Sequence, residues 1–185
     1  MRIQRFVGVA ALILVCGART AEAQETRTVG ITMGYPSSFG IHWQVNDKVA
    51  IRPELTLSGS SSNSSSNSFT GESENTAIGT GVSVLFYMGS YDHLRTYVAP
   101  RFNYGHASSE NTTSSVTTFN SESTSEAISG AGSFGAQYNP TDRFSVFGEF
   151  GFSYAHTTTE TSTSTQKVTG NAWGTRTAVG VIFFF

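Results

Sequence analysis

Apolar and polar residues alternate with a period of two along most of the chain after residue 28. The segment 143–155 shows the pattern most clearly. Its even positions are mostly aromatic or aliphatic: Phe144, Val146, Gly148, Phe150, Phe152 and Tyr154. Its odd positions are mostly small or polar. Successive residues of a β-strand point to opposite faces, so this period predicts strands with one apolar face.

The same alternation predicts an all-β fold of eight strands, at 28–35, 38–45, 48–58, 74–88, 95–108, 123–138, 143–158 and 166–185. Short connections rich in turn formers are expected at 36–37, 46–47, 90–93 and 139–142. The other connections, at 58–73, 109–122 and 159–165, are long tracts of Ser, Thr, Asn and Glu, which we interpret as polar loops. A disordered linker would have the same composition, but no segment beside a tract is long enough to fold alone.

The first 23 residues have the pattern of an export signal. Arg2 and Arg5 precede an apolar run at 6–16, which is too short to span a bilayer as a helix. Residues 21–23 give the small-x-small pattern of a cleavage site, so we expect cleavage after Ala23 and a mature domain at 24–185. Lipidation at Cys16 is disfavoured because Val15, which is not a small residue, precedes it.

Composition narrows the class of protein. The chain has 185 residues, of which 13% are charged, against roughly 25% in soluble domains. Ser and Thr supply 26 and 24 residues, and the formal net charge is −2. The aromatic content of 12% argues against disorder, and the charge argues against nucleic-acid binding, which needs clustered Lys and Arg.

The non-aromatic face decides between a soluble sandwich and a membrane barrel. The outer faces of a soluble sandwich are usually rich in Lys and Glu. Here that face carries mostly Gly, Ala, Ser and Thr with a few ionisable groups, as a narrow enclosed interior requires. Short turns alternating with longer polar connections also fit a transmembrane barrel. We therefore predict a membrane-spanning, eight-stranded antiparallel up-and-down β-barrel, whose bore side chains just fill.

The predicted inward positions contain both signs of charge. The strands at 74–88 and 123–138 offer small inward residues, which leave room for long side chains from the other strands. We expect a buried interior charge network of Arg52, Glu54, Arg101, Glu149 and Arg176, since buried charges persist only when they are paired. A last hairpin folded about 162–163 would place Glu149 opposite Arg176, and a hairpin folded about Asp47 would place Arg52 opposite His42.

The C-terminal segment 179–185 ends on Phe and carries apolar residues at every second position, including Val181, Phe183 and Phe185. It resembles the C-terminal assembly signal of bacterial outer-membrane proteins. Residues 28–185 as a whole resemble the small eight-stranded outer-membrane barrels, the family of OmpX and the OmpA membrane domain. The resemblance implies location in the bacterial outer membrane, insertion by the barrel-assembly machinery, and contact with outer-membrane lipid and lipopolysaccharide. No cell-wall-anchoring domain is expected after Phe185.

The leading functional hypothesis is a structural or surface-interaction barrel of the adhesion type, non-enzymatic, whose polar connections contact lipopolysaccharide, cells or phage. A small-solute pore is an alternative, as is a proton or ion path along the interior charges.

A third hypothesis rests on the small barrels that act as lipid A deacylases, which pair a His-x-Ser with an acid on the next strand. His106 and Ser108 have that spacing, and Glu122 or Glu126 could supply the acid for a lipid A or phospholipid acyl hydrolase. In a chain with 26 Ser this signal is weak. The four His lie on separate segments, so we expect no metal site and no cofactor.

Overall fold

A computed structural model describes residues 28–36, 38–66, 69–114, 118–162 and 167–185. The predicted signal segment 1–23 lies outside these residues. The structure is all β, with eight strands: β1 (Val29–Tyr35), β2 (Ser38–Asn46), β3 (Val49–Ser66), β4 (Phe69–Tyr91), β5 (Leu94–Ser114), β6 (Thr118–Thr141), β7 (Phe144–Thr161) and β8 (Lys167–Phe184). The described part contains no helix long and apolar enough to cross a bilayer.

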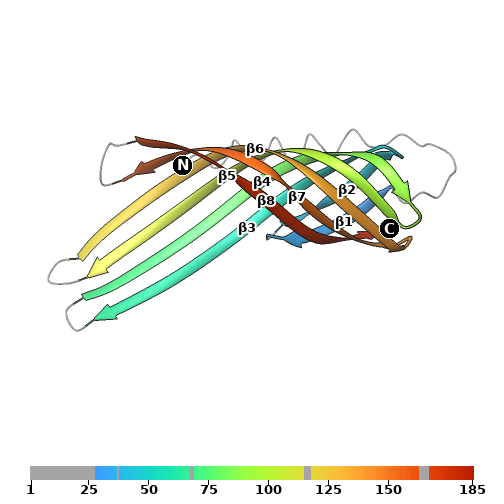
Figure 1. The fold of residues 1–185 in the computed structure, drawn as a ribbon. Coiled ribbons are helices and arrows are strands. Elements are labelled where there is room, and N and C mark those ends of the chain that lie inside the picture. Colours follow the sequence, from blue (N-terminus) through green and yellow to red (C-terminus); the bar gives the residue numbers. More distant parts are fainter. Residues whose placement is uncertain (1–27, 37, 67–68, 115–117, 163–166) are drawn as a thin grey trace, which may run out of the picture.

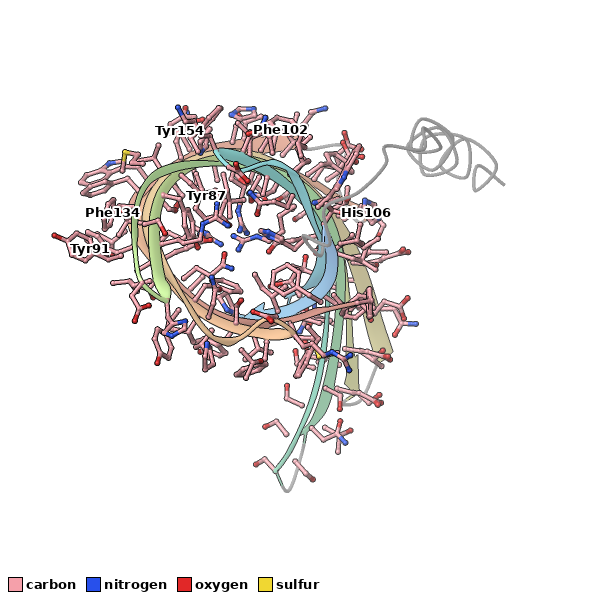
Figure 2. All side chains as sticks on the ribbon, turned by 90° about the vertical axis from the view of Figure 1, so that its right-hand side faces the viewer. Tyr87, Tyr91, Phe102, His106, Phe134 and Tyr154 are labelled. Atoms are coloured by element: carbon pink, nitrogen blue, oxygen red, sulfur yellow. The ribbon has the colours of Figure 1, made fainter. Side chains whose placement is uncertain are left out.

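The strands form a closed antiparallel barrel in sequence order, with β1 paired to β8 (Figures 1 and 2). The predicted eight-stranded up-and-down fold is confirmed. Consecutive pairing leaves no free edge in the barrel body, where every strand hydrogen-bonds on both sides. Closure of this kind satisfies backbone groups that would otherwise be exposed to an apolar medium.

The two faces of the wall differ as the alternation predicts. On β7, Ser145, Phe147 and Glu149 are buried inside the barrel. Phe150 and Phe152, on the same strand, lie outside and are more than half exposed. Figure 2, viewed along the barrel, shows Phe102, Phe134 and Tyr154 pointing outward and Tyr87 pointing inward. An apolar surface this extensive around a whole barrel marks it as a contact surface for other molecules.

The described parts of the Ser- and Thr-rich tracts are strands, so their interpretation as long loops is wrong there. These parts are 58–66, 69–73, 109–114, 118–122 and 159–161. Residues 163–165 of the last tract lie outside the described residues. β3 and β4 stay paired from Val49↔Phe86 to Ser66↔Phe69, and β5 and β6 stay paired out to Ser114↔Thr118. The tracts carry no apolar alternation, but each described backbone segment finds its ladder partner in the strand beside it. The hairpins therefore extend well past the barrel body (Figure 1).

The extended strands form a sheet that projects from one end of the barrel. One rung crosses six strands, through Leu57, Ile78, His106, Glu126, Thr158 and Thr169. We call the described residues from this rung outward the projecting sheet: 57–66, 69–78, 106–114, 118–126, 158–161 and 167–169. The short β1–β2 hairpin does not reach it, because β2 pairs with β3 only as far as Ser38↔Thr56 and β1 pairs with β8 only as far as Tyr35↔Val179.

Candidate functional site

The barrel interior is filled rather than open. Each of the eight strands places at least one buried side chain on the inside: Thr32, His42, Arg52, Leu85, Tyr97, Gln137, Phe147 and Ile182. Arg52, Leu85, Tyr97 and Ile182 have no exposed surface at all. Side chains from opposite walls therefore meet across the bore and exclude solvent from its middle.

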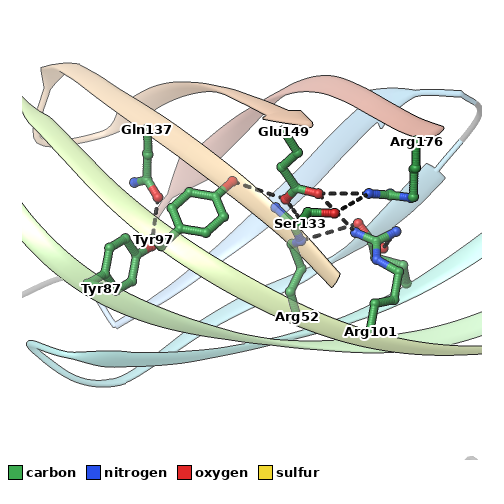
Figure 3. Close-up of polar contacts among 9 residues, drawn as sticks. Arg52, Tyr87, Tyr97, Arg101, Ser133, Gln137, Glu149 and Arg176 are labelled. Atoms are coloured by element: carbon green, nitrogen blue, oxygen red, sulfur yellow. Dashed lines mark hydrogen bonds and ion pairs between the residues drawn. The ribbon is translucent and has the colours of Figure 1, made fainter. Parts of the chain in front are cut away.

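Glu149 lies at the centre of an interior ion network (Figure 3). Its Oε1 accepts hydrogen bonds from Arg52 Nη2 and, at 3.0 Å, from the Tyr97 hydroxyl. Its Oε2 accepts one from Arg176 Nη1 at 3.0 Å and lies 3.7 Å from Arg101 Nη2. One carboxylate from β7 thus joins β3, β5 and β8.

Glu54 is the second carboxylate of the network. Its Oε2 lies 2.6 Å from Arg101 Nη1 and its Oε1 lies 3.3 Å from Arg52 Nε. The structure therefore brings together all five residues that the sequence places inside: Arg52, Glu54, Arg101, Glu149 and Arg176. Three guanidinium groups face two carboxylates, so the network carries one positive charge in excess.

The expected direct pairing of Glu149 with Arg176 is wrong. Glu149 lies opposite Ala178, and Arg176 lies opposite Gly151. The centre of the β7–β8 hairpin lies one residue further along the chain than 162–163. As a result, each residue of β7 faces a residue of β8 two positions further along than expected. The ion pair forms diagonally across the ladder, which the long Arg side chain can reach. For β2 and β3, the pairs Trp43↔Ile51 and Gly40↔Glu54 have the register that places Arg52 beside His42.

Small residues on the neighbouring wall give the network its room. A Cβ atom added to Gly135 would overlap the Tyr97 ring, and one added to Gly151 would overlap the Gly132 carbonyl oxygen. Glycine at 135 therefore lets the Tyr97 ring lie against β6, with its hydroxyl on Glu149. Arg52 also lies over the Phe147 ring, 4.5 Å from its centroid, a cation–π contact.

A second polar layer, which the sequence analysis did not identify, lies nearer the short turns. Tyr87 donates a hydrogen bond of 2.7 Å to Gln137 Oε1, and Gln137 Nε2 donates to Asn139 at 2.8 Å and to Ser145 at 3.1 Å. Arg95 lies over the Tyr87 ring at 3.7 Å. Tyr87, Arg95, Gln137 and Ser145 have the inward parity of Ser83, Arg101, Ser133 and Glu149 on β4, β5, β6 and β7. The alternation therefore already contained the signal for this layer.

Solved structures with similar folds include outer-membrane proteins. The major outer membrane protein of Thermus thermophilus superposes with a TM-score of 0.54 at 12% identity, over 85% of this chain and 98% of that one. The chain has the fold of the small outer-membrane β-barrels. Acinetobacter baumannii CarO (TM-score 0.48, 14% identity, 89% and 100% covered) and Yersinia pestis Ail (0.38, 14%, 85% and 95%) are more distant. No protein-family model matches this chain, and no curated protein sequence does.

The described residues show no hydrogen-bonded set of His, Ser and acid on the outer surface of the barrel. His106 points outward from β5 (Figure 2). Glu126, directly opposite, accepts its bond from the Tyr104 hydroxyl at 3.2 Å. Glu122 lies opposite Glu110, which is four residues further along β5 than His106. At about 3.3 Å per residue, Glu122 is therefore displaced from His106 by roughly 13 Å along the strand direction. Glu122 is therefore wrong as the acid, and within the described residues no hydrogen bond joins Ser108 to His106.

The C-terminal strand closes the barrel. Val181 lies opposite Met33 and Phe183 opposite Ile31. Phe183 and Phe185 are exposed on the outer surface, and Val181 has the parity of Phe183. The Phe185 backbone N–H donates to the Val29 carbonyl at 3.2 Å, and the rings of Phe183 and Phe144 are 5.2 Å apart. Among the described residues, no group of three His, Cys, Asp or Glu side chains is placed to hold a metal ion.

Proposed function

We propose that this protein is an integral barrel of the bacterial outer membrane whose role is structural or surface-interacting, of the adhesion type, and non-enzymatic. One observation carries the proposal: the bore is closed by buried side chains from all eight strands, while a hydroxyl-rich sheet projects from one end. Because the bore is filled, the outer surface and the projecting sheet are the parts of the barrel available for contact with other molecules. Residues 1–23 would direct export and be removed after Ala23.

The exposed apolar belt supports the membrane location. Phe102, Phe134 and Phe150 lie on the outer surface of the barrel body, and about half of the surface of each side chain is exposed. Tyr138 and Trp173 lie on the same outer surface, towards opposite ends of the barrel body, as aromatic girdles at the two interfaces do. Outer-membrane lipid and lipopolysaccharide are the proposed contacts of this belt. The barrel-assembly machinery would bind the last strand through Val181, Phe183 and Phe185.

The projecting sheet has two edges that can add a strand. Beyond Thr56, β3 pairs only with β4, and the part of β8 before Val179 pairs only with β7. Their outer N–H and C=O groups have no strand beside them among the described residues. An extended segment of a partner could pair with either edge, a common mode of recognition. Hydroxyl and amide side chains on the sheet suit polar, sugar-like surfaces.

Trimming the two longest hairpins tests this role. Residues 60–75 are replaced by Asn-Gly, which keeps the pair Gly59↔Thr76, and residues 109–123 are replaced in the same way, which keeps Ser108↔Thr124. We expect the trimmed protein to reach the outer membrane and to migrate differently before and after boiling, as a folded barrel does. We expect the full chain to confer clumping and retention on lipopolysaccharide-coated surfaces, and we expect cells producing the trimmed protein to lose both.

Variants with only one hairpin trimmed serve as matched controls and should retain part of the adhesion. Equal adhesion by the doubly trimmed and full-length proteins, with both folded, would overturn the surface-interaction role. Loss of heat-modifiable migration in the full-length protein would instead contradict the barrel in the membrane.

Conductance tests the filled bore. We expect the wild-type protein to be nearly silent in planar lipid bilayers, because the bore is closed by buried side chains such as Leu85, Tyr97 and Ile182. Arg176→Ala should also stay nearly silent, since these residues remain in place when the Arg176 side chain is removed. Steady ion-selective steps in the wild-type protein that change in Arg176→Ala would show a pore through the charge network.

A further inference from the structure

A cavity of about 250 Å³ lies directly on the charge network, on the side of the projecting sheet. Arg101 and Arg176 reach it from the network, together with Glu54. The remaining wall is mostly small or carries hydroxyl and amide groups, and it includes Ser38, Thr56, Gly81, Asn103, Gly105 and Ser129.

The two arginines of the cavity have unused hydrogen-bond capacity. Of the three guanidinium nitrogens of Arg176, only Nη1 has hydrogen-bond partners among the described residues. These partners are Ser133 Oγ at 3.3 Å and Glu149 Oε2 at 3.0 Å. Arg101 uses its Nη1 and Nη2 in ion pairs with Glu54 and Glu149. Within the described part of the chain, the other N–H groups of Arg101 and Arg176 are free to donate hydrogen bonds. The planar arrangement of guanidinium N–H groups fits the oxygens of phosphate and sulfate.

The charge balance also favours an anion. Three arginines share two carboxylates in the network, and the cavity wall itself holds two arginines and one glutamate. A pocket inside a barrel focuses such a field more strongly than a flat surface does. One additional negative group would balance the network.

In the part of the chain that the structure describes, the approach to the cavity carries no carboxylate. A second cavity of about 280 Å³ follows it along the inner face of the projecting sheet and is lined by serines, threonine, asparagine, alanine and glycine. The glutamates of the projecting sheet occupy positions with the parity of the outward-facing residues: Glu72, Glu74, Glu110, Glu122, Glu126 and Glu160. The inner face therefore offers a neutral, hydroxyl-lined path that does not repel an anion.

We propose that this cavity is a binding site for a small oxyanion of the phosphate or sulfate type, held by Arg101 and Arg176 with Asn103 and Ser129 as further donors. The site lies inside the barrel, so the expected ligand is the free ion and not a lipid headgroup. This proposal does not depend on the adhesive role, since trimming the hairpins beyond residues 59 and 108 leaves the cavity residues in place.

Calorimetric titration tests the site with inorganic phosphate and with sulfate. The protein is refolded in a maltoside detergent, and the ionic strength is held constant with sodium chloride. Gly105→Asp introduces a carboxylate at a position where an added Cβ meets no atom within 4 Å, and Gly105→Asn is its neutral match. We expect saturable binding by the wild-type protein, a loss of about tenfold or more in affinity for Gly105→Asp, and a change within about threefold for Gly105→Asn.

Arg176→Gln should weaken the binding by about tenfold as well. Heat-modifiable migration verifies that each variant is folded. The absence of saturable binding by the wild-type protein would overturn the proposal, as would equal affinity in Gly105→Asp. Loss in both Gly105 variants would rule out charge as the cause. A repeat in phosphatidylglycerol vesicles distinguishes the ligand source: undiminished binding supports the free ion, and abolished binding shows that headgroups occupy the site.

Discussion

Glu149→Gln is expected to lower the free energy of unfolding by about 3–5 kcal/mol, the usual cost of removing one partner from a buried ion network. The side chain of Glu149 is 1% exposed and accepts from Arg52, Tyr97 and Arg176. Glutamine keeps the shape but presents an NH₂ group to these donors and removes the charge. Arg52, which is fully buried, would then share Glu54 alone with Arg101.

Urea unfolding of the refolded protein measures this change, because the two tryptophans, Trp43 and Trp173, both lie on the outer surface and report on its environment. Glu160→Gln is the matched control. Glu160 is exposed and pairs with Lys167 at 3.1 Å, so its loss should cost less than about 1 kcal/mol. If Glu149→Gln unfolded at the same urea concentration as the wild-type protein, the network would not be a stabilising element.

The alternation of apolar and polar residues with a period of two predicted most of the fold, and it identified the charged residues inside the barrel. On β7 and β8, alternation assigns Glu149 and Arg176 to the interior from local sequence alone, because each residue reverses the face. The exact partners depend on register, which is set by the hairpin turn. A shift of one residue in the centre of the β7–β8 hairpin moved Arg176 from Glu149 to Gly151.

The projecting sheet could not be predicted in the same way. In the segment 58–66, serine follows serine with Gly59 and Asn63 between them, so neither face differs from the other. Such a tract becomes a strand because a second polar tract is held beside it by the barrel hairpin, a long-range cause that local pattern does not record. The Tyr87–Gln137 pair is similar, since β4 and β6 meet only across the bore.

Phe134→Arg is expected to lower the free energy of unfolding in lipid by about 2–4 kcal/mol, the cost of a cation at the middle of a bilayer on the outside of a barrel. Phe134 lies outside β6, between Tyr138 and Ile128, and is 54% exposed. Phe134→Ala separates the lost apolar area from the effect of the charge, and we expect it to be the milder of the two. Unfolding in vesicles of phosphatidylcholine, followed by migration before and after boiling, measures both.

Thr124→Arg is the matched control for the position along the strand. Thr124 has the same outward parity on β6 as Phe134 but lies in the projecting sheet, opposite Ser108 and Glu160. Beyond the bilayer an added arginine should cost about 0–1 kcal/mol. A lipid belt around the barrel body thus predicts a steep difference between two substitutions on one face of one strand. Equal effects at 124 and 134 would mean that water, and not acyl chains, covers Phe134, and the membrane-spanning assignment would be wrong.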